Sequence, residues 1–470
     1  MAMSEFRVRV DEALGNERMR GNIRRAMDGL MEKRLAVLPD PAERENLRTT
    51  CAALKARALA RLPGLLAELE TSCRRNGIQV HWAETTDEAN RICHGILEAR
   101  GARSLVKGKS MVSEEMGLTH YLETRGVEVL ESDLGEFILQ LAGEPPSHII
   151  APAIHKNRQD VAKLFRDRFP DIPYTEAIDE LAQNAREIMR QKFFTADAGL
   201  SGVNFAVAPT GTLCLVENEG NGRMSTTVPP VHIAVMGIEK VVESFEHVPP
   251  LLSLLTRSAT GQPITTYFNM INGPRRPGEK DGPEEVHLVL LDNGRSRMYA
   301  DPELKATLRC IRCGACMNHC PVYARLGGHA YGTVYPGPIG IIFEPQKEGL
   351  DRLGELTQAS TLCGACGEVC PVRIPIPGLI NRLRHDAVRK DAVATRGAGR
   401  RRKPAEAAAW RLWSAVYASP VAYRAFLKAA AIGRNLLPER LGPWTRVRTA
   451  PTPAGQSLHQ LAREKGFDDE

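Results

Sequence analysis

Two stretches of this 470-residue sequence decide its fold and chemistry: Cys310-Ile-Arg-Cys313-Gly-Ala-Cys316-Met-Asn-His-Cys320-Pro321 and Cys363-Gly-Ala-Cys366-Gly-Glu-Val-Cys370-Pro371. The first has the spacing of bacterial ferredoxins, in which three closely spaced thiolates hold one cluster and a fourth reaches across to the other. Two-residue gaps let one tight loop place three thiolates around a cluster, and the Cys-Pro pair then begins a helix. Zinc, the alternative metal for CxxC pairs, has no use for the third thiolate or the repeated Cys-Pro. The sequence therefore predicts two iron–sulfur clusters.

The crossing over of the fourth thiolate predicts the ligands of each cluster. Cluster 1 is expected to be held by Cys310, Cys313, Cys316 and Cys370, and cluster 2 by Cys320, Cys363 and Cys366. Cluster 2 is thus one thiolate short, and alignment on the Cys-Pro pairs places Ser360 at the vacant position. We expect cluster 2 to be either 4Fe-4S with a fourth ligand other than cysteine or 3Fe-4S. Either change alters the net charge, so the two clusters should differ in redox potential.

The composition is that of an ordinary globular protein and excludes general disorder, with 43% hydrophobic and 25% charged residues. Eleven cysteines, an odd number, cannot pair completely, and a chain this long needs no disulfide staples. The four cysteines outside the two motifs are isolated among apolar or helical neighbours, and we interpret them as buried core thiols: Cys51, Cys73, Cys93 and Cys214.

The hydrophobic pattern changes along the chain and predicts four regions. Residues 1–66 have apolar residues at helical spacing, broken at Pro39 and Pro41. Residues 67–300 alternate strand-length apolar runs with helix-like stretches, which predicts a layered, mostly parallel α/β domain. The expected strands include Val80–Trp82, Phe205–Ala208, Thr212–Val216, Val286–Leu290 and also His148–Ala151. A small, mainly helical dicluster domain over residues 301–390 and a helical basic tail over 391–470 follow.

Two polar loops of the α/β region follow expected strands. Lys107-Gly-Lys109-Ser110 precedes a helix, and we interpret its polar residues as structural. The second loop, Glu217-Asn218-Glu219-Gly220-Asn221-Gly222, lies where ligands bind in α/β sheets, at the carboxyl end of a strand. We expect Asn218 and Glu219 to contribute to a cofactor site, although turn formation explains the glycines and asparagines equally well.

Charge and targeting signals predict a cytoplasmic protein. The net charge is +6, and residues 391–470 hold 14 Lys and Arg against 7 Asp and Glu. We interpret the run Arg400-Arg-Arg-Lys403 as a solvated linker and expect no nucleic-acid partner. No signal peptide or membrane-spanning apolar stretch is present in the sequence, so membrane contact would be peripheral.

Several segments in this order resemble the lactate-utilisation iron–sulfur subunit family, the LutB type. They are Gly211-Thr-Leu-Cys-Leu-Val-Glu-Asn-Glu-Gly-Asn-Gly222, Pro263-Ile-Thr-Thr-Tyr-Phe-Asn269, Gly282-Pro-Glu-Glu-Val-His287, and the two cysteine motifs around His329-Ala-Tyr-Gly332 and Tyr335-Pro-Gly-Pro-Ile-Gly340. The resemblance covers about residues 20–460. It implies a LUD domain, similar in fold to sugar-isomerase and CoA-transferase-like domains, then a dicluster ferredoxin module and a C-terminal helical region. It also implies two partner subunits with which the chain oxidises L-lactate to pyruvate, allowing growth on lactate.

Two functions from different classes are compatible with the sequence. The first is an electron-transfer subunit of such a complex, passing electrons to a downstream acceptor. No GxGxxG or P-loop motif occurs, so we expect substrate oxidation to need a partner or a cofactor bound by the LUD domain. The alternative is an acyl- or sugar-phosphate-handling enzyme with regulatory clusters, in which Glu217 or Glu219 would be the nucleophile or base.

Overall fold

The structure, a computed structural model, describes residues 5–388, 404–436, 445, 449–450 and 452–466. The chain divides into two compact units, residues 1–400 and 401–470. The divisions expected at residues 66, 300 and 390 stay predictions.

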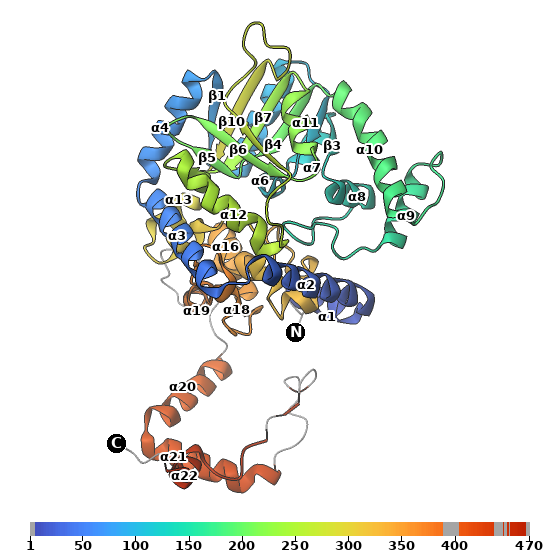
Figure 1. The fold of residues 1–470 in the computed structure, drawn as a ribbon. Helices are drawn as coiled ribbons and strands as arrows, with labels where there is room; N and C mark the ends of the chain where they lie inside the picture. The colour runs from blue at the N-terminus through green and yellow to red at the C-terminus, as the bar shows by residue number, and fades with distance from the viewer. Residues whose placement is uncertain (1–4, 389–403, 437–444, 446–448, 451, 467–470) are drawn as a thin grey trace. The chain divides into compact units, whose positions relative to one another are not determined.

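A six-stranded parallel sheet forms the centre of the first unit, with helices on both faces (Figure 1). Its strand order is β1-β10-β7-β4-β2-β3, with the bounds β1 Ile78–Ala83, β2 Ser104–Lys107, β3 Glu128–Glu131, β4 Ala198–Gly202, β7 Val231–Gly237 and β10 Glu285–Leu291. Alternate residues of β10 enter different cores: Leu288 and Leu290 face one side, Val289 and Leu291 the other. Burial on both faces explains the continuous apolar runs in these strands and confirms the expected parallel α/β class.

A smaller sheet, of order β8-β5-β6-β9, lies in the same unit. Its strands are β5 Phe205–Val207, β6 Thr212–Glu217, β8 Val241–Val242 and β9 Tyr267–Ile271. The Glu217–Gly222 loop leaves β6 and leads into α11 (Asn221–Thr227). The other helices after β1 are α5 Thr86–Ala99, α6 Met111–Met116, α7 Leu118–Glu123, α8 Leu134–Ala142, α9 Arg158–Arg168, α10 Ile178–Thr195, η1 Ile238–Lys240, η2 Phe245–His247, α12 Val248–Ala259 and α13 Arg295–Ala300.

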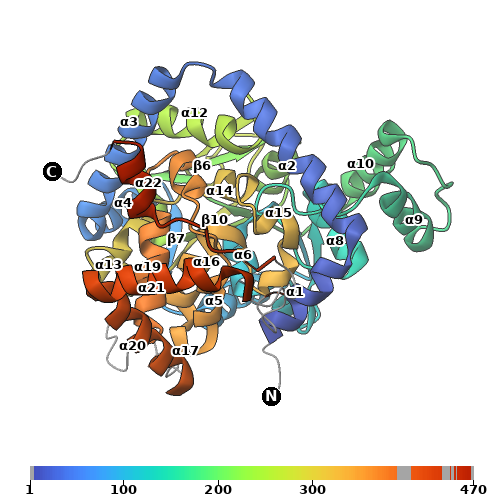
Figure 2. The same cartoon turned by 90° about the horizontal axis from the view of Figure 1, so that it is seen from below.

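The N-terminal region is helical, as its apolar spacing predicts. It comprises α1 Glu5–Gly15, α2 Glu17–Val37, α3 Pro41–Ala60 and α4 Leu62–Arg75. The break at the two prolines is sharp because Pro41 takes the first turn of α3, where the Asp40 carboxylate accepts a hydrogen bond of 2.8 Å from the Ala42 N–H. α2 runs alongside α14 and α15 of the cysteine module (Figure 2).

The cysteine module is built from short helices around the two motifs. They are η3 Leu304–Arg309, α14 Ala315–Asn318, α15 Tyr323–Leu326, η4 His329–Tyr331, α16 Gly337–Glu348, α17 Leu350–Leu353, η5 Gly354–Gln358, α18 Ala365–Val369 and α19 Ile376–Asp386. The module is joined to the α/β domain by buried hydrogen bonds. The Tyr323 hydroxyl donates to the Ser147 carbonyl at 2.7 Å, and the Asn318 side-chain amide donates to the Ala259 carbonyl at 2.9 Å.

The strand expected at His148–Ala151 is wrong, because this segment is a loop that packs on the cysteine module. The ring Nδ1 of His148 accepts hydrogen bonds from the Ile150 and Ala151 N–H groups at 3.0 and 3.1 Å, so these amides have no sheet partner. The Nε2–H is then left to donate to the Asn318 side-chain oxygen, 3.1 Å away. Burial lowers the pKa of His148 to about 4, which keeps the ring neutral.

The second unit contains α20 Pro404–Ala418, α21 Pro420–Ile432, η6 Gly433–Leu436 and α22 Leu458–Glu464. The basic run 400–403 lies outside the described residues, so its interpretation as a linker stays a prediction. Within the described parts of both units, every helix is too short or too polar to cross a membrane.

Candidate metal centre and adjoining pocket

The two cysteine motifs form two separate loops with the same backbone conformation. Arg312 and Leu362, the residues before Cys313 and Cys363, both have a left-handed backbone, with φ of 61° and 57°. Gly314 and Gly364 then take φ of 86° and 90°. A Cβ at Gly314 would approach the His148 ring to 3.2 Å, so this position needs glycine for space as well as for conformation. The two motifs therefore share the same run of left-handed backbone positions around Cys313 and Cys363.

The four thiols predicted for cluster 1 line one small cavity: Cys310, Cys313, Cys316 and Cys370. Its other walls are apolar and include Ile149, Ile339 and Ile376. Backbone N–H groups of Arg312 and Ile374 donate to the sulfurs of Cys310 and Cys370, each at 3.4 Å. Burial raises the pKa of Cys370 to about 11 and that of Cys316 further, so thiolates here require a bound cation such as iron.

The three thiols predicted for cluster 2 form a second group. Cys366 lies within electrostatic range of both Cys320 and Cys363. Cys320 and Cys366 are buried, whereas Cys363 is exposed. The Tyr323 N–H donates to the Cys320 sulfur at 3.5 Å. The second group therefore lies at the surface of the module, and the first in its interior.

Ser360 takes the place in its loop that Cys310 takes in the first. The Leu362 N–H donates to the Ser360 hydroxyl at 3.1 Å, which corresponds to the bond from the Arg312 N–H to the Cys310 sulfur. The structure thus brings both expected sets of thiols together, across the two motifs, and the apolar walls and N–H donors fit two iron–sulfur clusters. The assignment of individual iron ligands stays a prediction.

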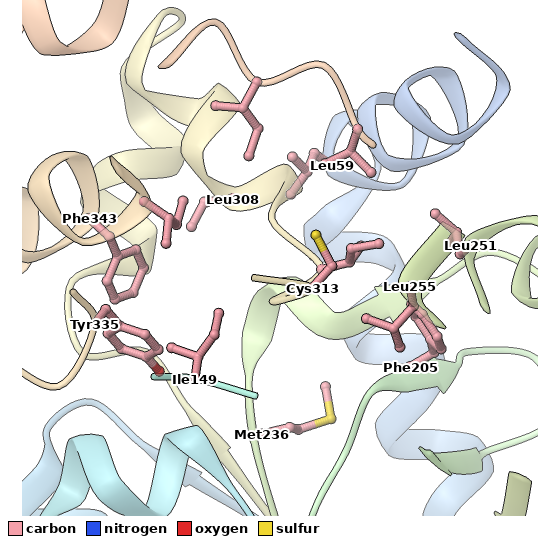
Figure 3. Close-up of a cluster of buried hydrophobic side chains, with 14 of the residues drawn as sticks. Leu59, Ile149, Phe205, Met236, Leu251, Leu255, Leu308, Cys313, Tyr335 and Phe343 are labelled. Carbon is pink, nitrogen blue, oxygen red and sulfur yellow. The ribbon is translucent and has the colours of Figure 1, made fainter. Parts of the chain in front are cut away.

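A pocket of about 490 Å³ adjoins cluster 1, within the size range of small-molecule sites. It lies at the carboxyl ends of β2, β3, β4 and β7, where parallel sheets bind ligands. Cys313 lines both this pocket and the cavity of cluster 1. Figure 3 shows Cys313 among apolar side chains from both the α/β domain and the cysteine module, including Leu255, Met236, Ile149, Tyr335 and Phe343.

The pocket contains the two residues expected to bind a cofactor, Asn218 and Glu219. The Glu219 carboxylate accepts a hydrogen bond of 3.1 Å from the Leu134 N–H at the start of α8. Loss of solvent around this carboxylate, and then the nearby Asp133, raise its pKa to about 6. The Asn218 side chain accepts from the Thr266 N–H at 3.0 Å. Nothing in these contacts identifies a cofactor, so this role stays a prediction.

Glu217, the alternative nucleophile, has a structural role. Its two carboxylate oxygens accept hydrogen bonds from the N–H groups of Gly220 and Arg223 and from the Asn269 amide. These bonds hold the loop that enters α11 and occupy the oxygens that would attack a substrate. Glu219, the other residue named for this role, lines the pocket with a raised pKa, so the acyl- or sugar-phosphate-handling enzyme stays an alternative prediction.

Sequence reasoning missed the cations of the pocket, Lys240 on η1 and Arg312 in the first cysteine motif. Both are buried, with 7% and 8% of their surface exposed. Lys109, from the loop interpreted as structural, also lines the pocket, whereas Lys107 is buried in ion pairs with Glu131 and Glu114. In the sequence, only the position of Arg312 between two predicted ligand cysteines could have indicated that positively charged side chains gather in this pocket.

A buried ion network connects the sheet to the cysteine module. Arg295, fully buried on α13, donates to both Glu115 oxygens at 3.0 and 2.8 Å and to Glu239 at 2.7 Å. Tyr335 donates to the same Glu115 at 2.9 Å. Burial alone would raise the pKa of Glu115, but Arg295 and Lys347 lower it to about 2. This carboxylate is therefore charged and fixed against its partners.

The four cysteines outside the motifs are buried, as expected for core thiols: Cys51, Cys73, Cys93 and Cys214. Burial raises the pKa of each to about 12, so they remain protonated. None of them lines either the pocket or the cavity of cluster 1.

A parallel α/β domain joined to a two-motif cysteine module defines an iron–sulfur protein of the dicluster class. Residues 66–291 match the LUD domain family, residues 306–374 the 4Fe-4S dicluster domain, and residues 382–467 the family described as Lactate utilisation protein B, C-terminal. The chain belongs to the lactate utilization protein B family, which confirms the resemblance found in the sequence.

Relatives of that name match along almost the whole chain. The protein from Bacillus velezensis is 41% identical over 458 residues, 95% of this chain and 94% of its own length. That from Bacillus subtilis is 44% identical over 390 residues, 83% of this chain and 81% of its own length. A crystal structure of a DUF162 family protein from Deinococcus radiodurans covers 49% of this chain and 98% of that protein, at 15% identity and a TM-score of 0.28.

Proposed function

We propose that this chain is the iron–sulfur electron-transfer subunit of a complex that oxidises L-lactate to pyruvate. One observation carries the proposal: Cys313 lines both the pocket of the LUD domain and the cavity of cluster 1. A molecule oxidised in the pocket, or at its mouth, would lie beside a ligand of cluster 1. The names of the relatives, lactate utilization protein B, support lactate as the source of the electrons.

The chain supplies an inner and an outer cluster position. Each cluster, when bound, accepts and releases one electron at a time, so that two of them divide the pair released by a hydroxy acid. Cys310, Cys313, Cys316 and Cys370 hold the inner position beneath the pocket. The outer position ends in Cys363, which is exposed, next to Leu362, which is 36% exposed. We propose that the electron acceptor docks at this second motif.

The proposal includes two partner subunits, as the resemblance to the LutB type implies. The sequence has no GxGxxG or P-loop motif, so we expect a partner, or a cofactor bound by the LUD domain, to accept the hydride. The test is lactate turnover with an artificial acceptor, measured under anaerobic conditions with the purified chain alone and after addition of its partners. We expect turnover only in the presence of the partners. Turnover by the chain alone, with its clusters as the only cofactor, would contradict the partner requirement.

We further propose that Ser360 leaves cluster 2 with a weak or missing fourth protein ligand. Ser360→Cys should complete the set, since the Leu362 N–H already supports a side chain at this position as in the first motif. If the natural cluster is 3Fe-4S, iron analysis should show a gain of about one iron per chain, with loss of the oxidised-state EPR signal of a 3Fe centre.

If the natural cluster 2 is 4Fe-4S, the iron content of Ser360→Cys should stay constant and the potential of cluster 2 should fall, because a thiolate adds negative charge. Gln358→Cys is the matched control, since this exposed side chain of η5 belongs to no expected ligand set. Identical iron content, EPR signals and potentials in Ser360→Cys and the natural chain would contradict this account.

A further inference from the structure

Two buried cationic side chains, Lys240 and Arg312, line the pocket, and each has a charged group that lacks a hydrogen-bond partner among the described residues. The described residues offer the Lys240 ammonium no hydrogen bond or ion pair, although Lys240 is 93% buried, with 7% of its surface exposed. Arg312 lies within electrostatic range of Lys240. Its guanidinium stacks over the rings of Tyr335 and Phe343 at 4.1 and 4.3 Å, and its Nη1 is buried without a hydrogen-bond partner. Buried charged donors of this kind are costly unless an anion satisfies them.

The carboxylate nearest to this pair, Glu239, is shared among several cations. One of its oxygens accepts a hydrogen bond of 2.7 Å from Arg295, while the other makes no hydrogen bond, lies 3.7 Å from Arg312 and belongs to the carboxylate that attracts Lys240. Lys55, also buried, donates to the Glu239 backbone carbonyl rather than to its carboxylate. Among the described residues, Lys55, Lys240, Arg295 and Arg312 share the buried carboxylates of Glu115 and Glu239. The pocket itself is also lined by Lys33 and Lys109 and by three acidic residues, Asp133, Glu217 and Glu219. The thiolate of Cys310 attracts Lys240 and Arg312, but it belongs to the cavity of cluster 1, which Lys240 does not line.

The surroundings of the two cations select the kind of anion. Lys240 follows the carboxyl end of β7, and apolar residues such as Val203, Val235 and Leu255 share the pocket with it. A planar, singly charged carboxylate with a small alkyl group matches a planar guanidinium, an ammonium and apolar walls. Phosphate, which is larger in charge, is typically bound by helix N-termini and clusters of backbone N–H groups.

We propose that Lys240 and Arg312 bind the carboxylate of a small 2-hydroxy or 2-oxo acid in this pocket, beside Cys313. The inference deepens the proposed function, on which it rests, by assigning residues of this chain to the substrate or product. In this arrangement the acid lies beside Cys313, a predicted ligand of cluster 1. The hydroxyl or oxo group of the acid then faces the rest of the pocket.

Calorimetric titration of the anaerobically purified full chain tests this site without turnover. The probes are L-lactate, L-lactamide, in which a neutral amide replaces the carboxylate, and inorganic phosphate. We expect L-lactate to bind at least tenfold more tightly than either of the other two. Equal affinities for lactate and lactamide, tighter binding of phosphate, or no binding of lactate would overturn the proposal.

Variants of Lys240 test whether its ammonium contributes to the affinity for lactate. Lys240→Met should weaken lactate binding at least tenfold and change lactamide binding less than twofold, while Lys240→Arg retains most of the affinity. Lys163→Met, which removes an exposed lysine of α9 remote from the pocket, is the matched control. If Lys240→Met shifts the potential of cluster 1 and leaves lactate affinity within twofold, Lys240 serves the cluster and the proposal fails.

The comparison of lactate with lactamide in the natural chain remains decisive if Lys240→Met does not fold. Failure of the binding test leaves the electron-transfer proposal standing, since that proposal is tested by cluster reduction in the assembled complex. Conversely, lactate binding with clusters that stay oxidised would overturn only the electron-transfer proposal.

Discussion

Cys370→Ala is expected to abolish cluster 1, although Cys370 lies in the second motif. The cavity of cluster 1 contains Cys370 together with three thiols of the first motif, and the Ile374 N–H fixes its sulfur. Removing one of four thiolates from a buried site leaves an iron without a ligand, so we expect nearly complete loss of the EPR signal of the reduced 4Fe-4S cluster 1.

The pairing of variants makes this test specific. Cys370→Ala and Cys310→Ala should lose the same EPR signal, and Cys320→Ala and Cys363→Ala should lose the other. Cys73→Ala, at a buried cysteine outside the motifs, should retain all iron and both signals. If Cys370→Ala instead loses the signal that Cys363→Ala loses, each motif holds its own cluster and the crossed arrangement is wrong.

Arg295→Met should destabilise the first unit by about 3–5 kcal/mol, the usual cost of removing one partner from a buried ion pair. The substitution keeps an unbranched apolar side chain but removes the guanidinium, which leaves the carboxylates of Glu115 and Glu239 without their shared cation. Arg295 is a main cause of the low pKa of Glu115, so in the variant burial should raise this pKa, and the loss of stability should become smaller as the pH falls and the carboxylate takes up a proton.

The measurement for Arg295→Met is the midpoint of urea unfolding of the full chain under anaerobic conditions, with iron content checked in parallel. Arg297→Met is the matched control on the same helix, since Arg297 is exposed and makes one hydrogen bond, to the Lys347 carbonyl at 3.2 Å. We expect the control to change stability by less than about 1 kcal/mol. Equal midpoints for the two variants would show that the buried network does not stabilise the fold.

Much of the fold could be predicted because the central strands are buried on both faces. The apolar runs around Ile233 and Leu288 have strand length and no polar alternation, as expected of strands in a parallel sheet covered on both faces. The same criterion failed at His148–Ala151, where a side-chain nitrogen takes the place of a neighbouring strand as the hydrogen-bond acceptor. Periodicity cannot distinguish these two ways of satisfying backbone amides.

The candidate site also has a part that the sequence predicts and a part that it does not. Ferredoxin spacing fixes which thiols meet, because two-residue gaps and the Cys-Pro pair impose the loop geometry locally. Of the pocket, only the loop with Asn218 and Glu219 could be predicted, because it follows a strand of the α/β domain. Lys240 and Arg312 could not, since they come from separate elements that the sheet and the cysteine module bring together. Arg312 in particular acquires its pocket position from contacts with Tyr335 and Phe343, which are distant in sequence.

The central claim is that electrons from L-lactate enter this chain at cluster 1 and leave through cluster 2. Its most direct test is freeze-quench EPR of the anaerobic complex of this chain with its partners, after addition of L-lactate without an acceptor. We predict that the signals of reduced clusters appear within the turnover time, and that in the Cys363→Ala complex only cluster 1 becomes reduced. Lactate oxidation at the full rate by the complex while both clusters of this chain stay oxidised would contradict the account.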